Sequence, residues 1–156
     1  MSSRVLDLDA ARYLELAREV LAAGGGLWMN GSGASMLPLI RPGDRVFAEG
    51  RVGSPAVGQI VVVDRGTRFV VHRVVAVDGG RIVTRGDASD RPDAAVTRQA
   101  VVGRVLAVEH AGRCAAVAVT GRFGVGPLLY GAANLARATL HRLWRACRRA
   151  RRRRLR

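Results

Sequence analysis

The spacing of the apolar residues constrains the fold of this chain more than any other feature of its sequence. Between residues 27 and 119, short runs of Val and Ile alternate with Gly, Pro and Asp, which favour turns. This pattern predicts a mainly β domain of short strands, with a hairpin turn at Asp78-Gly79-Gly80. We expect the strands at 27–31, 44–49, 58–64, 68–77, 80–84, 99–108 and 113–119.

Helical periodicity flanks the strand-rich region on both sides. Residues 9–23 predict a helix that Asp9 caps and that the glycines at 24–26 end. Residues 127–150 predict a second helix, with one apolar stripe, Trp144 beside that stripe, and arginines on the remaining faces. The chain therefore divides into an N-terminal helix with a glycine linker (1–26), a β domain (27–120), and a basic amphipathic helix with an Arg-rich tail (121–156).

The charge of the chain comes from arginine alone, and much of it lies in the C-terminal region. The formal net charge is +14, and the sequence contains no Lys. Every mechanism that needs a lysine is therefore excluded, including a Ser-Lys dyad, a Schiff base and a P-loop. The helix at 127–150 fits an anionic membrane surface, and it fits equally a helix packed on the domain with a solvated end. Binding to nucleic acid ranks last, because no aromatic residues interleave with the arginines for base stacking.

The sequence contains no clear signal peptide or membrane span. Acidic residues lie within the first apolar stretch, unlike in a signal peptide. The nearest candidate for a span, residues 114–136, is interrupted by Arg122 and several glycines. We therefore expect a cytoplasmic protein that binds peripherally at the inner face of the membrane, with anchoring through 114–136 as the alternative.

Metal and cofactor chemistry finds little support in the sequence. The cysteines, Cys114 and Cys147, and the scattered histidines lack the spacing of metal ligands. Asp87, Asp90 and Asp93 share one loop, but no acidic residue closes that loop at the spacing of a calcium-binding EF-hand. We therefore expect neither a metal ion nor a cofactor.

Residues 31–46 contain a serine in a setting that suits a nucleophile. The glycines near Ser35 let the backbone bend so that its hydroxyl and nearby N–H groups can face one point. His72, in the apolar run at 68–77, is the candidate base that would activate this serine in a chain without lysine. Each signal alone is weak, because most such serines only shape a turn and a lone strand histidine usually packs in the core. The acidic loop that follows fits a metal loop, a solvated turn, or the acid that orients His72.

Taken in order, these segments resemble the motifs of type I signal peptidases. The matching residues are Ser35-Met36-Leu37-Pro38 followed by Gly43-Asp44, then Gly58-Gln59-Ile60-Val61-Val62, His72-Arg73-Val74, and Gly86-Asp87 with Asp93 six residues on. Histidine as the base, in a chain without lysine, is similar to the endoplasmic-reticulum and archaeal branch of that family. The resemblance covers about residues 27–108.

The resemblance implies a signal-peptidase-like catalytic β domain and a serine endopeptidase that removes a leader or signal segment from a precursor. It implies that Ser35 is the nucleophile and His72 the general base. Asp87 or Asp93 would orient the imidazole, and the resemblance leaves the choice between them open. The residues implied to hold the oxyanion and the substrate are Ser32, Gly33, Ala34, Met36 and Pro38.

One departure from the motifs leaves a second function open. Signal peptidases usually have a hydroxyl residue two positions before the nucleophile, where this chain has Gly33. In this respect the site is similar to the self-cleaving SOS-repressor peptidases, which share the fold but use lysine. The alternative is therefore a non-catalytic peptide-binding or regulatory module on the same fold, with the Arg-rich tail docking to a membrane or to nucleic acid. We expect a peptide to lie extended across residues 30–35 and part of the strand at 67–74.

Overall fold

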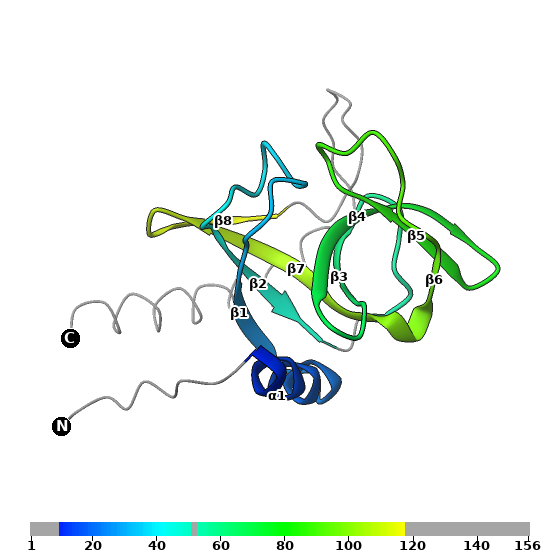
Figure 1. Ribbon diagram of the computed structural model, residues 1–156, viewed down its shortest axis with the longest axis horizontal. Coiled ribbons are helices and arrows are strands. Elements are labelled where there is room, and N and C mark those ends of the chain that lie inside the picture. The colour runs from blue at the N-terminus through cyan, green and yellow to red at the C-terminus, as the bar shows by residue number, and fades with distance from the viewer. Residues whose placement is uncertain (1–9, 51–52, 118–156) are drawn as a thin grey trace, which may run out of the picture.

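In the part of the chain that the structure describes, one antiparallel β-sheet, curled on itself, makes up most of the fold, and one helix packs against one end of this sheet (Figure 1). The computed structural model describes residues 10–50 and 53–117. The expected C-terminal helix and Arg-rich tail at 121–156 lie outside these described residues, as does most of the candidate span at 114–136. Within the described ranges, no helix is both long and apolar enough to cross a membrane.

The observed elements confirm the mainly β fold of short strands. Helix α1 spans Ala10–Ala22. The strands are β1 (Gly26–Asn30), β2 (Arg45–Glu49), β3 (Ile60–Asp64), β4 (Phe69–Asp78), β5 (Arg81–Arg85), β6 (Val96–Thr97), β7 (Val101–His110) and β8 (Arg113–Ala116). Their order in the sheet is β1-β2-β7-β3-β4-β5-β6, with β8 also paired to β7, and every pairing is antiparallel.

The apolar core lies on both faces of β3. Successive side chains of a strand point to opposite faces, so Val62 packs in one cluster while Val61 and Val63 pack in another. The first cluster contains Leu21, Met29, Met36, Ile40, Val46, Val62 and their neighbours. The second contains Val61, Val63, Val74, Ile82 and Val101. Burial on both faces explains why the run at 60–63 is apolar without interruption.

Helix α1 meets the sheet through a close backbone approach at its C-terminal end. Leu21 is fully buried in the core. Gly24, with a φ of +80°, donates its N–H to the Leu21 carbonyl at 2.9 Å and ends the helix. Gly50, directly after β2, passes so close that a Cβ there would lie 1.7 Å from the Leu21 carbonyl oxygen. Only glycine fits at position 50, and the helix expected at 9–23 is confirmed with its end at the glycines.

Some turns and short elements could be predicted from the local sequence, and others could not. Gly79 and Gly80 both have positive φ and join β4 to β5, so the expected hairpin is confirmed. By contrast, the two-residue β6 and the 3-10 turn at Arg98–Ala100 were not expected, and β7 begins at Val101 rather than at 99. A strand of two residues is too short to show a period, and β6 exists only because β5 pairs with it.

Two loops project from the same end of the sheet (Figure 1). The first connects β1 to β2 and carries Ser35, and the second connects β5 to β6 and carries Asp87 and Asp93. The two loops contact each other, because the Ala88 N–H donates to the Ser35 carbonyl at 2.8 Å. The segments that were singled out in the sequence therefore meet in one place.

Candidate active site

The loop between β1 and β2 carries Ser35, and it is fixed at two places, at its base and in its middle. At the base, the Gly31 N–H donates to the Asp44 carbonyl at 2.8 Å, which closes the loop. In the middle, the side chains of Met36 and Ile40 are buried in the core. Ser35 itself stays partly exposed. In the local sequence, small residues at 31–35 are followed by two buried side chains, Met36 and Ile40, and this arrangement leaves Ser35 partly exposed.

His72 connects Ser35 to an aspartate. It lies on β4, and its Nε2 is 2.9 Å from the Ser35 Oγ while its Nδ1 is 2.6 Å from the Asp93 Oδ2. An ionised carboxylate can only accept a hydrogen bond, so Nδ1 carries the proton and Nε2 is left to accept from the serine hydroxyl. The histidine side chain is only 11% exposed. Ser35, His72 and Asp93 therefore form the hydrogen-bonded chain of a Ser-His-Asp triad.

Asp93 is held in place by Thr84 as well as by His72. The buried Thr84 hydroxyl donates to the Asp93 Oδ2 at 2.6 Å, and the Asp93 N–H donates back to the Thr84 carbonyl at 2.8 Å. Burial by itself raises the pKa of Asp93, but hydrogen bonds from His72 and Thr84, together with the charges of His72 and Arg65, outweigh burial and hold this pKa below its usual value. Asp93 is therefore ionised at neutral pH.

Asp87, the other candidate for orienting the imidazole, pairs with a different residue. The Arg73 Nε and one terminal nitrogen donate to its two carboxylate oxygens at 2.7 and 2.6 Å, and the other terminal nitrogen donates to the Gly58 carbonyl at 2.8 Å. Arg73 neighbours His72 on β4, so the two side chains point to opposite faces. The sequence did not decide whether Asp87 or Asp93 contacts the imidazole. In the structure Asp93 contacts it, and Asp87 binds Arg73 and so fixes the loop.

Gly86 contributes to the site through its lack of a side chain. A Cβ at this position would lie 2.6 Å from the Ser35 carbonyl oxygen and 2.9 Å from the Ser35 Cβ. The loop that follows β5 can therefore pass against the serine only with glycine here. Sequence reasoning did not assign a role to Gly86 or to Thr84, although Gly86 belongs to the Gly-Asp motif that carried the resemblance.

The small residues before Ser35 leave backbone donors open. Ser32, Gly33 and Ala34 are exposed, and a Cβ on Gly33 would lie 4.0 Å from the Ser35 Oγ. No described residue accepts a hydrogen bond from the backbone N–H groups of Ser32 to Met36. The Met36 side chain lies in the core, and the residue is almost fully buried. Pro38 follows a cis peptide bond and is exposed.

Comparison with known protein families decides where this chain belongs. A family model described as Peptidase S24-like matches residues 3–106, a range that contains Ser35, His72 and Asp93. The chain belongs to the Peptidase S24-like family. No curated protein matches the chain in sequence. Membership supports the expected superfamily of serine peptidases, and the match is to the S24-like family rather than to type I signal peptidases.

In this S24-like protein, a hollow of about 550 Å³ opens beside the triad. His72 and Asp93 form part of its wall. The turn between β3 and β4 supplies Arg65, Thr67 and Arg68, and β4 supplies Val70. Within the described ranges, no group of three or more His, Cys, Asp or Glu side chains is arranged to hold a metal ion.

A second His–Asp pair lies at the end of the serine loop in this S24-like protein. The Nδ1 of His110, the last residue of β7, is 2.5 Å from the Asp44 Oδ1, and the Asp44 Oδ2 accepts from the Arg41 N–H at 2.8 Å. The Asp44 side chain is only 4% exposed. Burial raises the pKa of Asp44, but the hydrogen bonds from Arg41 and His110 outweigh burial and hold this pKa below its usual value.

Proposed function

We propose that this protein is a serine endopeptidase in which Ser35 is the nucleophile, His72 the general base and Asp93 the residue that orients and stabilises the imidazole. The observation that carries the proposal is the 2.9 Å contact between the Ser35 Oγ and the His72 Nε2, with Asp93 on the opposite ring nitrogen. A serine hydroxyl needs a base of this kind to become nucleophilic. The S24-like family supports the same general chemistry.

The proposed reaction follows from the positions of these three groups. The Ser35 Oγ attacks the carbonyl carbon of the scissile bond while its proton passes to the His72 Nε2. Asp93 stabilises the imidazolium that forms, and this imidazolium then donates its proton to the departing amine as the peptide C–N bond breaks. Water, deprotonated by the same imidazole, hydrolyses the acyl-enzyme and restores the serine. Backbone N–H groups between Ser32 and Met36, which no described residue uses, are available to the oxyanion.

The proposed peptide-binding edge lies on β4. Residues Phe69–His72 pair with β3 along one edge, whereas β5 joins the other edge only from Arg73 onward. No described strand pairs with that second edge between Phe69 and His72. An extended peptide can pair with such an edge through its backbone. The open edge reaches as far as His72, so a peptide bound there would lie beside the proposed base. This edge supports the expectation that a substrate crosses residues 67–74.

The substrate class that we propose is a leader or signal segment of a precursor protein. Its support is the order of the Ser35-Met36, His72-Arg73 and Gly86-Asp87 motifs, which resembles that of signal peptidases. By that resemblance, cleavage would follow a small residue. For the C-terminal segment, which lies outside the described residues, we keep an anionic membrane as the proposed partner and nucleic acid as the less favoured one. Flotation with anionic and with neutral liposomes tests this partner.

The experiment that tests the peptidase is covalent labelling combined with a cleavage profile. Purified protein and its Ser35→Ala variant are treated with a fluorophosphonate and, separately, with a proteome-derived peptide library read by mass spectrometry. Ser54→Ala, at an exposed serine outside the site, is the matched control. We expect labelling and cleavage by the parent and the control and neither by Ser35→Ala. Labelling that persists in Ser35→Ala would refute the proposed nucleophile.

A non-catalytic peptide-binding module on the same fold is the second candidate. The observation that favours it is Gly33, an exposed glycine at the position where signal peptidases carry a hydroxyl. Such a module would bind extended peptides along β4 without reacting with the fluorophosphonate. Labelling of Ser35 decides between the two candidates, because only an activated hydroxyl reacts.

A further inference from the structure

The hollow beside the triad has a basic wall. Arg65, Thr67 and Arg68 of the β3–β4 turn line it together with His72 and Asp93. Within the described part of the chain, neither Arg65 nor Arg68 forms an ion pair with an acidic side chain. Arg65 instead donates to the Ala94 carbonyl at 3.4 Å. Two arginines therefore line the hollow without forming an ion pair to any described residue. Asp93 is the one carboxylate among the described lining residues, and it offsets only one of the two positive charges, so the lining keeps a net positive charge.

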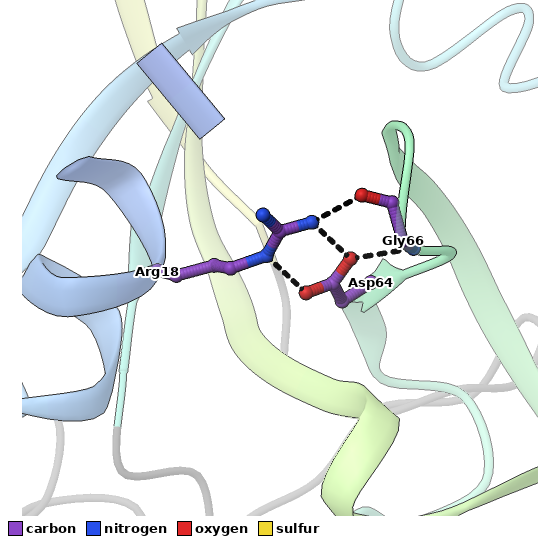
Figure 2. A network of polar contacts seen from close by, with 3 residues as sticks. All are labelled: Arg18, Asp64 and Gly66. Carbon is purple, nitrogen blue, oxygen red and sulfur yellow. Dashed lines mark hydrogen bonds and ion pairs between the residues drawn. The ribbon is translucent and has the colours of Figure 1, made fainter. Parts of the chain in front are cut away.

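The nearest carboxylate on this hairpin is already engaged elsewhere. Figure 2 shows the Arg18 side chain of α1 reaching the Asp64 carboxylate, with Nε to Oδ2 at 2.6 Å and the second nitrogen to Oδ1 at 3.0 Å. Arg18 also donates to the Gly66 carbonyl, and the Gly66 N–H donates to the Asp64 Oδ1 at 2.8 Å. The charge of Asp64 is thus balanced by Arg18 and does not offset Arg65 or Arg68.

The same contacts fix the turn that carries the two arginines. Helix α1 holds Asp64 and Gly66 through Arg18, and the Arg65 N–H donates to the Arg68 carbonyl at 2.9 Å across the turn. A turn restrained at several points presents its side chains with a smaller loss of conformational freedom on binding. The helix therefore acts on the hollow at a distance, by positioning the β3–β4 turn.

The hollow also lies where side chains of a bound peptide would point. Val70 and His72 alternate with Phe69 and Val71 along β4, and only the first pair lines the hollow while the second packs on the core. A peptide added to the open edge of β4 has the same alternation. Every second side chain of such a peptide would face the wall formed by the arginines.

We propose that this hollow binds an acidic side chain, Asp or Glu, of the peptide substrate, and that Arg65 and Arg68 determine this specificity. The inference rests on the proposed function, because it assigns a substrate preference to the same site. Guanidinium groups suit carboxylates because their donors match the two oxygens. Such a substrate would have an accepted residue at the scissile bond and an Asp or Glu one or a few residues away from that bond.

The test measures binding, so that it does not depend on cleavage. The full-length Ser35→Ala chain is titrated with extended peptides of Ala, Ser and Gly, made in pairs that differ by Asp or Asn at one position. We expect the best Asp peptide to bind about five- to tenfold more tightly than its Asn partner at low salt. High salt should reduce this ratio, because the charges are partly exposed.

Matched variants separate the hollow from the rest of the basic surface. Arg65→Gln/Arg68→Gln should bring the Asp/Asn ratio close to one. Arg65→Lys/Arg68→Lys keeps the charges but loses the paired donors, so it should give an intermediate ratio. Arg81→Gln/Arg113→Gln removes the same charge from exposed positions outside the hollow and should keep the full ratio. Thermal melting by circular dichroism checks that each variant is folded. If Arg65→Gln/Arg68→Gln does not fold, the Asp/Asn ratio of the Lys variant and the salt dependence of that ratio still test the inference.

The outcomes distinguish the specificity from the activity. Equal binding of Asp and Asn peptides at every position, no binding of either, or a ratio that persists in Arg65→Gln/Arg68→Gln would overturn the inference. Serine-dependent labelling without an acid preference would refute the basic hollow and leave the peptidase standing. An acid preference in a chain whose Ser35 is never labelled would refute the peptidase and keep the hollow.

Discussion

His72 and His110 each place Nδ1 against an aspartate, at 2.6 Å from Asp93 and at 2.5 Å from Asp44. In the first pair the histidine is the buried partner, and its other nitrogen meets the Ser35 hydroxyl. In the second pair the acid is buried, and the histidine side chain is 57% exposed. The first arrangement aims a base at a nucleophile, whereas the second satisfies a buried carboxylate at the end of a loop. A His–Asp contact alone therefore does not identify a catalytic site.

Replacing each histidine should give the largest difference between the two His–Asp pairs. For His72→Ala, we expect serine labelling and peptide cleavage to fall by about 10⁶-fold, the size seen when a triad base is removed. For His110→Gln, which leaves Ser35, His72 and Asp93 in place, we expect rates within about threefold of the parent, the scatter expected for a surface change. Rates of fluorophosphonate labelling measure both. Equal losses in the two variants would mean that the pairs do not differ in role.

Replacing the two aspartates should separate activity from stability. For Asp93→Asn, we expect a loss of about 10³- to 10⁴-fold in rate, because the imidazole loses the partner that sets its tautomer. For Asp44→Asn, the larger effect should be on folding, a loss of about 1–3 kcal/mol, because a buried group loses its charged hydrogen bonds. Urea unfolding and labelling rates, measured on both variants, give the two readouts. A large rate loss in Asp44→Asn without a stability loss would contradict the structural role given to it.

Adding one methyl group at Gly86 tests whether the loop after β5 must lie this close to Ser35. Gly86→Ala would place a Cβ 2.6 Å from the Ser35 carbonyl oxygen, so the serine or the loop must shift. A displacement of about 1 Å costs on the order of 10²-fold in rate, and we expect that loss in labelling. Gly53→Ala is the matched control, because a Cβ there meets nothing within 4 Å. Full labelling of Gly86→Ala would show that the close approach is unnecessary.

The smallest expected effect is the dependence of stability on acid pH. The pKa values of Asp44 and Asp93 lie below the ordinary value of 3.8 because their hydrogen bonds outweigh burial. The unfolded chain therefore takes up protons at higher pH than the folded chain does, and stability is lost as the pH falls from about 4 through the folded pKa values. Urea midpoints between pH 6 and pH 3 should decline less in Asp44→Asn than in the parent. An unchanged decline would mean that Asp44 has no share in the acid sensitivity.

Much of the fold could be predicted because its signals are local. The alternation of Val and Ile with turn residues produced a strand in each expected place, and Gly79-Gly80 produced the hairpin. The buried run at 60–63 is apolar because both faces of β3 are covered. Elements such as β6 could not be predicted, since two residues carry no period and gain their structure only from β5.

The amino-acid sequence alone was enough to predict which chemical groups this site has available. A chain without lysine, with Ser35 after small residues and His72 in an apolar strand, has few other ways to activate a serine. Which aspartate meets the imidazole depends on contacts across the fold: Thr84 of β5 binds Asp93 through two hydrogen bonds, while Arg73 holds Asp87. The approach of Gly86 to Ser35 and the hollow shared by two arginines depend on the fold in the same way. Such contacts join residues far apart in the chain, and their distances depend on how the strands pair, which no local pattern encodes.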